Sequence, residues 1–285
     1  MGGRGLSGRP MVSRVEPRTL SLAEVSRRRA VIWRTTRSRR VRREAEAVEF
    51  IEALGFVPLM RLSGADLPSL QAANGDSSTW WDWKQLLPER RLCCYTRLLR
   101  NRGTFISWEW LPRFLAVYRS PRSYEEEYRL GLLGRREKRV LDLLAESDEG
   151  GLMTRELRLA YAPPSKRATR ELKQTLAYLQ ANFWAIPAGG DTEGWSHHRW
   201  DLVDRWVPRS LLSAGRRLPR HRAQAELAQR LVEITLFSTP ADIAWIFGWS
   251  RAEAAEAAET LLAHGKLTRG HIRGIEGEVL LPGPR

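Results

Sequence analysis

The sequence has few of the residues that form disulfides and metal sites. Only two cysteines, Cys93 and Cys94, and five histidines occur among its 285 residues. Neighbouring cysteines rarely reach the geometry of a disulfide bond, and neither the thiols nor the histidines show the spacing of metal ligands. We therefore expect a reduced protein without a metal ion or other cofactor. Cys93 and Cys94 are predicted to be core residues of a helix.

Long hydrophobic runs are also missing. No apolar stretch approaches the roughly 20 residues that cross a bilayer, and the first 18 residues contain no continuous apolar segment of a secretory signal. These residues are rich in arginine and poor in acid, as in a transit peptide, but the basic tails of nucleic-acid-binding proteins have the same composition. We expect a cytoplasmic, nucleoid-associated protein that makes no membrane contact.

Lysine is scarce, because only 5 of the 47 basic residues are lysine. The net charge of +14 is also unevenly spread: residues 1–43 hold 13 Arg and 2 Glu, a net charge of +11, which leaves +3 for the other 242 residues. A genome that favours arginine codons explains the choice of arginine but not this clustering. Such a cluster is typical of proteins that bind a polyanion such as double-stranded DNA. The candidate phosphate contacts are Arg34, Arg37, Arg39, Arg40, Arg42 and Arg43.

The C-terminal quarter predicts three helices followed by two short strands. Thr239 precedes Pro240, which is the order of an N-cap and a first helical residue. Ser250 and Glu253 have the spacing of a capping box, and Gly265 stands where the last helix should stop. The segments 136–147, 154–161 and 165–180, followed by a hairpin over 183–203, repeat the same order earlier in the chain. This order of elements predicts a winged helix-turn-helix in each unit.

The predicted fold is therefore mainly α, with small β-hairpin wings, in tandem winged helix-turn-helix units. The N-terminal part is less regular. It combines an amphipathic helix over 44–54, a strong helix over 88–103, a short strand over 104–107 and a helix over 108–118. The predicted organisation is a disordered basic tail over 1–20, an N-terminal helical, winged-helix-like domain over 21–130, and winged-helix domains over 131–208 and 209–285.

The third helix of a helix-turn-helix normally enters the major groove. In the middle unit this helix carries four cations that suit phosphates or guanines, namely Lys166, Arg167, Arg170 and Lys173. The alternative is an ordinary solvated helix face that includes Glu171. The corresponding helix of the last unit carries Glu253, Glu256 and Glu259, which a duplex would repel. We therefore expect the middle unit to contact DNA and the last unit to serve packing.

Three tryptophans, Trp80, Trp81 and Trp83, lie within four positions around Asp82. They could stack against an unpaired or flipped base, with Asp82 as an acid or base. The alternative, which we favour slightly, is a set of core aromatics where a loop meets a helix.

The run "TWWDWKQLLPERRLCCYTRLLRNRGTFISWEWLPRFLAVY", the later "HHRWDLVDRWVP" and the two winged units together resemble AlkZ-related proteins. These are relatives of the YcaQ/AlkZ family of winged-helix DNA glycosylases, which excise alkylated bases and unhook interstrand crosslinks. The resemblance extends from Ser21 onward. It implies tandem winged helices that form a concave surface around DNA. The family's enzymes also carry a C-terminal β-rich domain, for which we expect this chain to be too short.

The resemblance also locates a catalytic motif. In active family members, Leu-Gly-apolar-apolar-Gln-apolar-Gln or Asp follows an amphipathic helix, and the polar pair positions the water that attacks the anomeric carbon. Here the matching segment is "LGFVPLM", so Pro58 and Met60 occupy the positions of the pair. Neither side chain can accept a proton or orient a water molecule.

Three functions remain open at this point. The leading one is a DNA-binding protein of the AlkZ-related branch that has lost base excision. The second is an active glycosylase that uses a relocated carboxylate, for which Asp66, Asp82 and Glu109 are the candidates. The third is a winged-helix transcription regulator that dimerises through its acidic C-terminal unit. The sequence leaves the lesion, the target sequence and the oligomeric state open.

Overall fold

The computed structural model describes residues 18–75, 78–148, 150–192 and 197–284. The helices are α1 (Leu22–Ile32), α2 (Glu44–Leu54), α3 (Leu70–Asn74), α4 (Trp83–Glu89), α5 (Leu111–Tyr118), α6 (Tyr124–Arg129), α7 (Arg135–Glu146), α8 (Thr154–Tyr161), α9 (Lys166–Ala181), α10 (Val203–Trp206), α11 (Arg209–Arg217), α12 (Arg220–Thr235), α13 (Pro240–Phe247) and α14 (Arg251–Ala263). The strands are β1 (Arg18–Ser21), β2 (Phe56–Pro58), β3 (Cys94–Arg97), β4 (Gly103–Ile106), β5 (Leu152–Met153), β6 (Ala185–Asp191), β7 (His197–Leu202), β8 (Leu267–Arg273) and β9 (Val279–Pro282). Three short 3₁₀ turns are η1 (Arg37–Arg39), η2 (Thr79–Trp81) and η3 (Leu99–Asn101).

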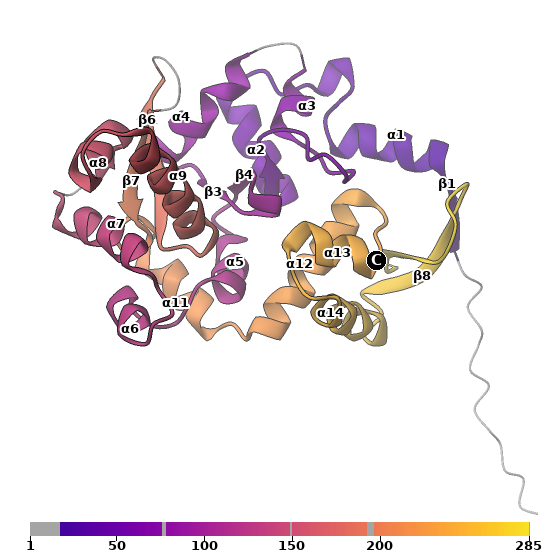
Figure 1. Ribbon diagram of the computed structural model, residues 1–285. Coiled ribbons are helices and arrows are strands. Elements are labelled where there is room, and N and C mark those ends of the chain that lie inside the picture. The colour runs from indigo at the N-terminus through magenta and orange to yellow at the C-terminus, as the bar shows by residue number, and fades with distance from the viewer. Residues whose placement is uncertain (1–17, 76–77, 149, 193–196, 285) are drawn as a thin grey trace, which may run out of the picture.

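Helices dominate, and the strands form three small sheets with the orders β1-β8-β9, β2-β4-β3 and β5-β7-β6. This confirms the predicted mainly α fold with small β elements. The sheets lie apart in Figure 1, with β6 and β7 beside α7–α9, β3 and β4 in the middle, and β8 beside α12–α14. In the described part of the chain, no helix is both long enough and apolar enough to cross a membrane.

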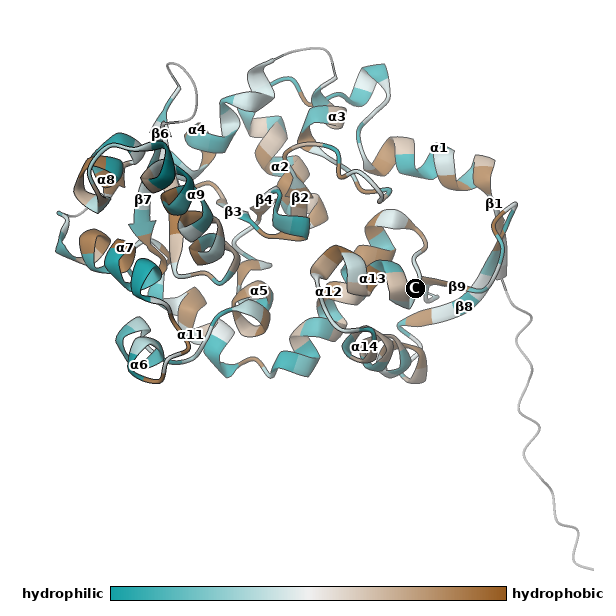
Figure 2. Cartoon of the chain, in the orientation of Figure 1, coloured by the Kyte–Doolittle hydropathy of each residue, from teal (hydrophilic) through white to brown (hydrophobic). Residues whose placement is uncertain are grey.

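The middle unit has the order α7-β5-α8-α9-β6-β7, which is the order expected for a winged helix. Ser165 caps α9, because its hydroxyl accepts a hydrogen bond from the Ala168 N–H at 3.0 Å. The unit encloses a core of its own, which includes Leu141, Leu172 and Leu179. Figure 2 shows hydrophilic residues on the outer faces of α7 and α9 and hydrophobic residues toward the strands.

The C-terminal helices and hairpin form at the predicted positions. Complete capping boxes start α13 at Thr239 with Asp242 and start α14 at Ser250 with Glu253. The unpredicted feature is β1, which pairs in parallel with β8 in the register Leu20 to Ile272. Residues 18–20, assigned above to a disordered tail, thus form a strand, because Leu20 is buried in the small core that this sheet encloses. The rest of the predicted tail lies outside the described residues.

The strong helix predicted over 88–103 is wrong. Helix α4 ends at Glu89, Arg91 adopts a left-handed conformation with φ 53°, and the chain then forms β3 and β4. Strand pairing sets Cys94 opposite Ile106 and Tyr95 opposite Phe105, so tertiary contacts override the high helix propensity of leucine and arginine. Cys93 and Cys94 are buried free thiols, as expected, but no helix carries them, and burial raises the pKa of both.

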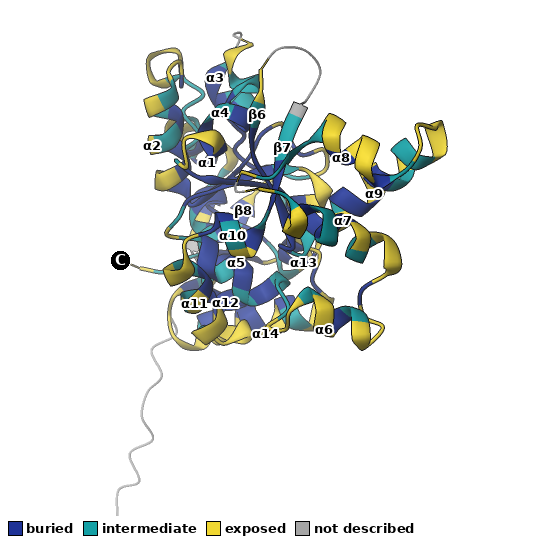
Figure 3. Cartoon of the chain, turned by 90° about the vertical axis from the view of Figure 1, so that its left-hand side faces the viewer, coloured by how far each residue is buried: buried dark blue, intermediate teal, exposed yellow. Residues whose placement is uncertain are grey.

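The largest hydrophobic core joins residues that are distant in sequence. It contains Phe50 of α2, Phe114 of α5 and Leu231 of α12. Figure 3 shows this buried interior, with the exposed residues on the outer faces of the helices. The C-terminal helices therefore share a core with the N-terminal part, and β6 of the middle unit contributes Ile186 and Ala188 to it, while α7, α8 and α9 enclose a second core.

Candidate nucleic-acid interface

A groove of about 680 Å³ runs between α9 and the turn that links β3 to β4. None of the eleven described residues that line it is acidic. Its positively charged residues, which we call the basic groove, are Arg97, Arg158, Lys166, Arg170 and Lys173.

The cations of α9 face this groove because of their helical spacing. Lys166, Arg170 and Lys173 lie four and three positions apart, so they share one side of the helix. Leu172 and Leu176 lie on a different side of the helix, buried in the core of the middle unit. Among the described residues, no carboxylate lies within ion-pair distance of any of the five groove cations. Their charge is therefore not neutralised within the described protein.

Arg167 behaves differently from the other predicted cations of α9. It does not line the groove, and its Nε donates to Glu171 at 3.0 Å. Glu171 also pairs with Arg136 at 3.2 Å, and the hydrogen bond from Arg167 lowers the pKa of the Glu171 carboxyl. The structure thus brings Lys166, Arg170 and Lys173 together and separates Arg167 from them.

The predicted cations near α2 divide into internal and exposed groups. Arg34 donates to the Glu46 carbonyl at 3.1 Å, pairs with Glu49 at 3.7 Å and lies over the ring of Phe50, so it supports the fold. Arg43 pairs with Glu46 at 2.6 Å. Arg40 is partly buried, whereas Arg37, Arg39 and Arg42 are exposed around η1.

Helix α1 holds the described part of the basic N-terminal segment against α12. Arg29 Nε donates to the Thr235 carbonyl, and Trp33 Nε1 donates to the Ile234 carbonyl, both at 2.7 Å. Residues 18–33 are therefore folded onto the C-terminal part through β8 and α12, whereas Arg34 and Val41 bond to Glu46 and Ala73.

The positions of the catalytic pair lie at the end of β2. Gly55 ends α2 with φ 83°, and a Cβ there would come within 2.7 Å of the Trp110 ring, so glycine is required. Pro58 is buried opposite Thr104 on the edge of the central sheet. Met60 lies beyond the strand and is 47% exposed. Neither position presents an atom that could orient a water molecule.

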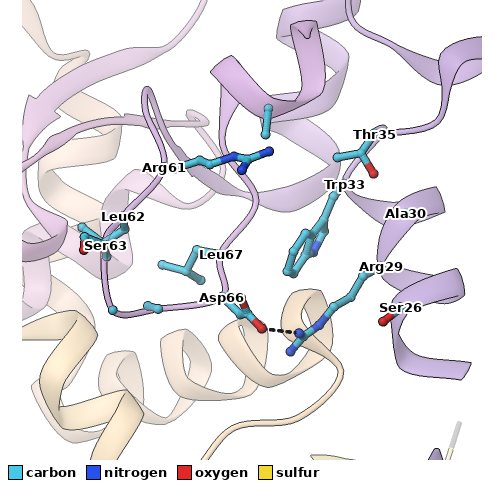
Figure 4. A pocket seen from close by; sticks show the side chains of 13 residues that line it. Ser26, Arg29, Ala30, Trp33, Thr35, Arg61, Leu62, Ser63, Asp66 and Leu67 are labelled. Carbon is cyan, nitrogen blue, oxygen red and sulfur yellow. Dashed lines mark hydrogen bonds and ion pairs between the residues drawn. The ribbon is translucent and has the colours of Figure 1, made fainter. Parts of the chain in front are cut away.

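A cavity of about 900 Å³, which we call the α1 cavity, opens between α1 and the loop after Met60. In Figure 4, Trp33, which follows the end of α1, lies across it from Leu67, and Arg61 lies at its upper edge. Asp66 enters the same cavity, where its Oδ2 accepts from Arg29 Nη1 at 2.9 Å (Figure 4). Asp66 is exposed, and its ion pair with Arg29 positions the carboxylate at the cavity.

The other two candidate carboxylates lie elsewhere. Asp82 precedes α4 without accepting a side-chain capping bond, and it does not line the α1 cavity. Glu109 is exposed before α5, where its carbonyl accepts from Arg113 at 2.6 Å, and it does not line this cavity either. Of the three candidates, only Asp66 enters a cavity next to the position of the pair.

The three clustered tryptophans pack around the start of α4. Trp83 is buried in the main core, which agrees with the structural alternative for this residue. Trp80 and Trp81 are partly buried and meet edge to face at 5.7 Å. The ammonium of Lys84 lies 3.7 Å from the centre of the Trp81 ring. Base stacking by Trp80 and Trp81 stays a prediction.

Two basic residues lie near the contact of α4 with β6: Lys84, which is buried, and His198, which is partly buried. Burial lowers the pKa of Lys84 to about 8, against the opposing effect of Asp82. Burial, together with the positive charges of Lys84 and Arg97, lowers the pKa of His198 to about 4. The His198 ring is partly buried, with its centroid 6.0 Å from that of Tyr95.

The model of the AlkZ-related family matches residues 41–248, which is most of the chain. The chain belongs to the AlkZ-related family. No curated protein matches this AlkZ-related protein. It is similar to the solved structure of Streptomyces sahachiroi DNA glycosylase AlkZ, with a TM-score of 0.54 and 12% identity, over 90% of this chain and 69% of that one. At that identity, the likeness establishes a shared fold.

Two cations of the basic groove in the AlkZ-related protein, Arg97 and Arg158, were not predicted from the sequence. Arg97 was hidden within the segment predicted as helix, where nothing indicated a turn toward α9. Arg158 lies on α8, the second helix of the middle unit. The available signal was that α8 is a short helix directly before the third helix, so its exposed cations stay close to that helix. Arg29, Trp33 and Arg61 of the α1 cavity carried no local signal, because three separate segments meet there.

Proposed function

We propose that the AlkZ-related protein binds double-stranded DNA through the basic groove and does not excise bases. The proposal includes a role related to DNA repair and a place beside the nucleoid in the cytoplasm. The observation that supports it is the basic groove itself, whose five cations have no ion-pair partner, and whose lining has no acidic residue, in the part of the chain that the structure describes. Phosphate contacts by lysine and arginine release counterions from DNA, and each contact contributes about 0.9 to the slope of log affinity against log salt.

The absence of excision follows from Pro58 and Met60. A positioned general base or water-orienting group contributes roughly 10² to 10⁴ to a rate, and neither side chain can supply one. Among the described residues, no cluster of three or more His, Cys, Asp or Glu side chains has the arrangement of a metal site.

The test of binding compares two double variants that remove the same charge. Arg170→Ala with Lys173→Ala should lower the salt slope by about 1.8, because two phosphate contacts are lost. Arg216→Ala with Arg222→Ala is the matched control, since these exposed arginines pair with Asp204 and Glu226 away from the groove. Fluorescence anisotropy with an intact duplex over a salt series measures both slopes. Equal slopes for the two variants would contradict the groove as the binding surface.

The test of excision uses the same wild-type protein on a duplex with one N7-methylguanine. We expect abasic-site formation no faster than in the protein-free control. Rapid turnover would overturn this part of the proposal and leave binding intact.

A glycosylase with a relocated carboxylate is the second candidate, because Asp66 enters the α1 cavity beside the position of the pair. It requires turnover that Asp66→Asn abolishes and that Asp82→Asn leaves unchanged.

A further inference from the structure

The turn η3 between β3 and β4 holds Arg100 in an unusual conformation. Arg100 has φ 50° and ψ 36°, and the next residue, Asn101, has φ 57°. Two successive non-glycine residues in the left-handed region are sterically disfavoured, and such conformations concentrate at functional sites. This backbone directs the exposed Arg100 guanidinium over the ring of Trp245, with its carbon 4.6 Å from the ring centroid.

Trp245 differs from the other tryptophans in the part of the chain that the structure describes, since it alone is exposed, at 37%. Its neighbours on α13, Ile243, Ala244, Ile246 and Phe247, are buried and anchor the helix. The core therefore does not require an aromatic ring at this position. The Trp245 ring and the Arg100 guanidinium above it together form a surface that is open to solvent.

This pair lies between the basic groove and the α1 cavity. Asn101, directly after Arg100, lines the groove. On the other side the Trp245 ring edge lies against Gly64, where a Cβ would come within 3.2 Å of it, and Gly64 lines the α1 cavity. A nucleic acid in the groove would thus have Arg100 and Trp245 directly beside it, toward the cavity.

We propose that Arg100 and Trp245 form a stacking platform for an unpaired base of the DNA whose backbone lies in the basic groove. The inference rests on the proposed function. The planar guanidinium of Arg100 already covers one face of the Trp245 indole. An unpaired base would stack on the outer face of this guanidinium, so that base, guanidinium and indole form three layers. Arginine planes and tryptophan rings are the surfaces on which proteins stack unpaired bases, independently of sequence.

The competing explanation is that the contact only joins η3 to α13. A purely structural contact would affect the melting temperature and the affinity for all DNA alike. A stacking platform instead favours DNA with an unpaired base over intact duplex. The ratio of the two affinities therefore separates the explanations.

The experiment compares an intact duplex with the same duplex carrying one unpaired 2-aminopurine, at equal salt. Wild-type protein should prefer the second duplex and quench its fluorescence. Trp245→Ala should lose that preference by roughly fivefold to a hundredfold, the range that base stacking on aromatic side chains contributes. Trp245→Phe should keep part of it, and Arg100→Ala should weaken it. Leu159→Ala, which removes an exposed apolar side chain from α8, is the control and should keep the full preference.

Each outcome decides a separate point. Wild-type protein that binds both duplexes equally overturns the platform and leaves the proposed function standing. A full preference in Trp245→Ala overturns it as well. Protein that binds neither duplex overturns both proposals. If Trp245→Ala has a lowered melting temperature, the surface variant Arg100→Ala is used instead. A full preference for the unpaired base in Arg100→Ala would then overturn the platform, and a weakened preference would support it.

Discussion

Pro58 and Met60 lie two positions apart, yet one is buried and the other is exposed. Alternate residues of a strand share a face, but β2 ends at Pro58, so this alternation does not reach Met60. A glutamine placed at 58 would consequently enter a packed core rather than a water-filled site. The loss of the catalytic pair stays a prediction, and the sequence did not predict that the strand ends at Pro58.

His198 makes the fold sensitive to acid. Its pKa is about 4 in the folded protein, against about 6.5 for an unperturbed histidine. The unfolded chain therefore binds the extra proton first, so stability is fully present above about pH 6.5 and is lost as the pH falls toward 4. His198→Phe removes this proton uptake and keeps a ring beside Tyr95.

We expect acidification from pH 7 to pH 4.5 to destabilise the wild type more than His198→Phe, by roughly 1 to 2 kcal/mol. Urea unfolding at the two pH values measures the difference. Equal losses in the two proteins would show that the buried imidazole does not control acid stability.

Among the elements, prediction succeeded where capping and helical periodicity agree. Ser165, Thr239 and Ser250 each start a helix as their sequences indicate. It failed over 88–103, because leucine and arginine favour a helix locally while β4 supplies the partner strand. The basic groove depends on this strand, since Arg97 ends β3, and its full set of cations could not be inferred from helix patterns.

Substitutions in the turn η1 and at the nearby Arg34 should distinguish residues that bind DNA from residues that stabilise the fold. The exposed arginines around η1 are predicted phosphate contacts in addition to the basic groove, so Arg37→Ala with Arg39→Ala should lower the salt slope by about 1.8 and leave the melting temperature unchanged. Arg34→Ala should keep the slope and destabilise the fold by roughly 1 to 2 kcal/mol, because its bond to the Glu46 carbonyl is lost. Salt titration and thermal melting of each variant test the distinction, and reversed effects would refute it.

At the scale of the whole molecule, the shared core couples the two ends of the chain. Leu231 of α12 is fully buried in the core that also contains Phe114 of α5. Leu231→Ala should cost about 2 to 5 kcal/mol and should speed hydrogen exchange in α5 as well as in α12. Leu141→Ala, in the separate core of the middle unit, is the matched control.

The expected pattern for Leu141→Ala is faster exchange confined to the middle unit, α7 to β7. Hydrogen exchange with mass spectrometry measures both variants. Unchanged exchange in α5 of Leu231→Ala would mean that the C-terminal helices unfold separately. Domain boundaries at 130 and 208 stay a prediction, which this comparison examines directly.

The parallel pairing of β1 with β8 has a consequence for synthesis on the ribosome. Register pairs Ser21 with Arg273, so the first described strand has no partner until about 250 further residues have been made. At roughly 5 to 20 residues per second, that is a wait of about 10 to 50 s. Helix α1 waits almost as long for α12, which receives the hydrogen bonds of Arg29 and Trp33. Residues 18–33, which include Arg27, Arg28 and Arg29, are thus made long before their partners in β8 and α12, and they remain open to polyanions during that interval.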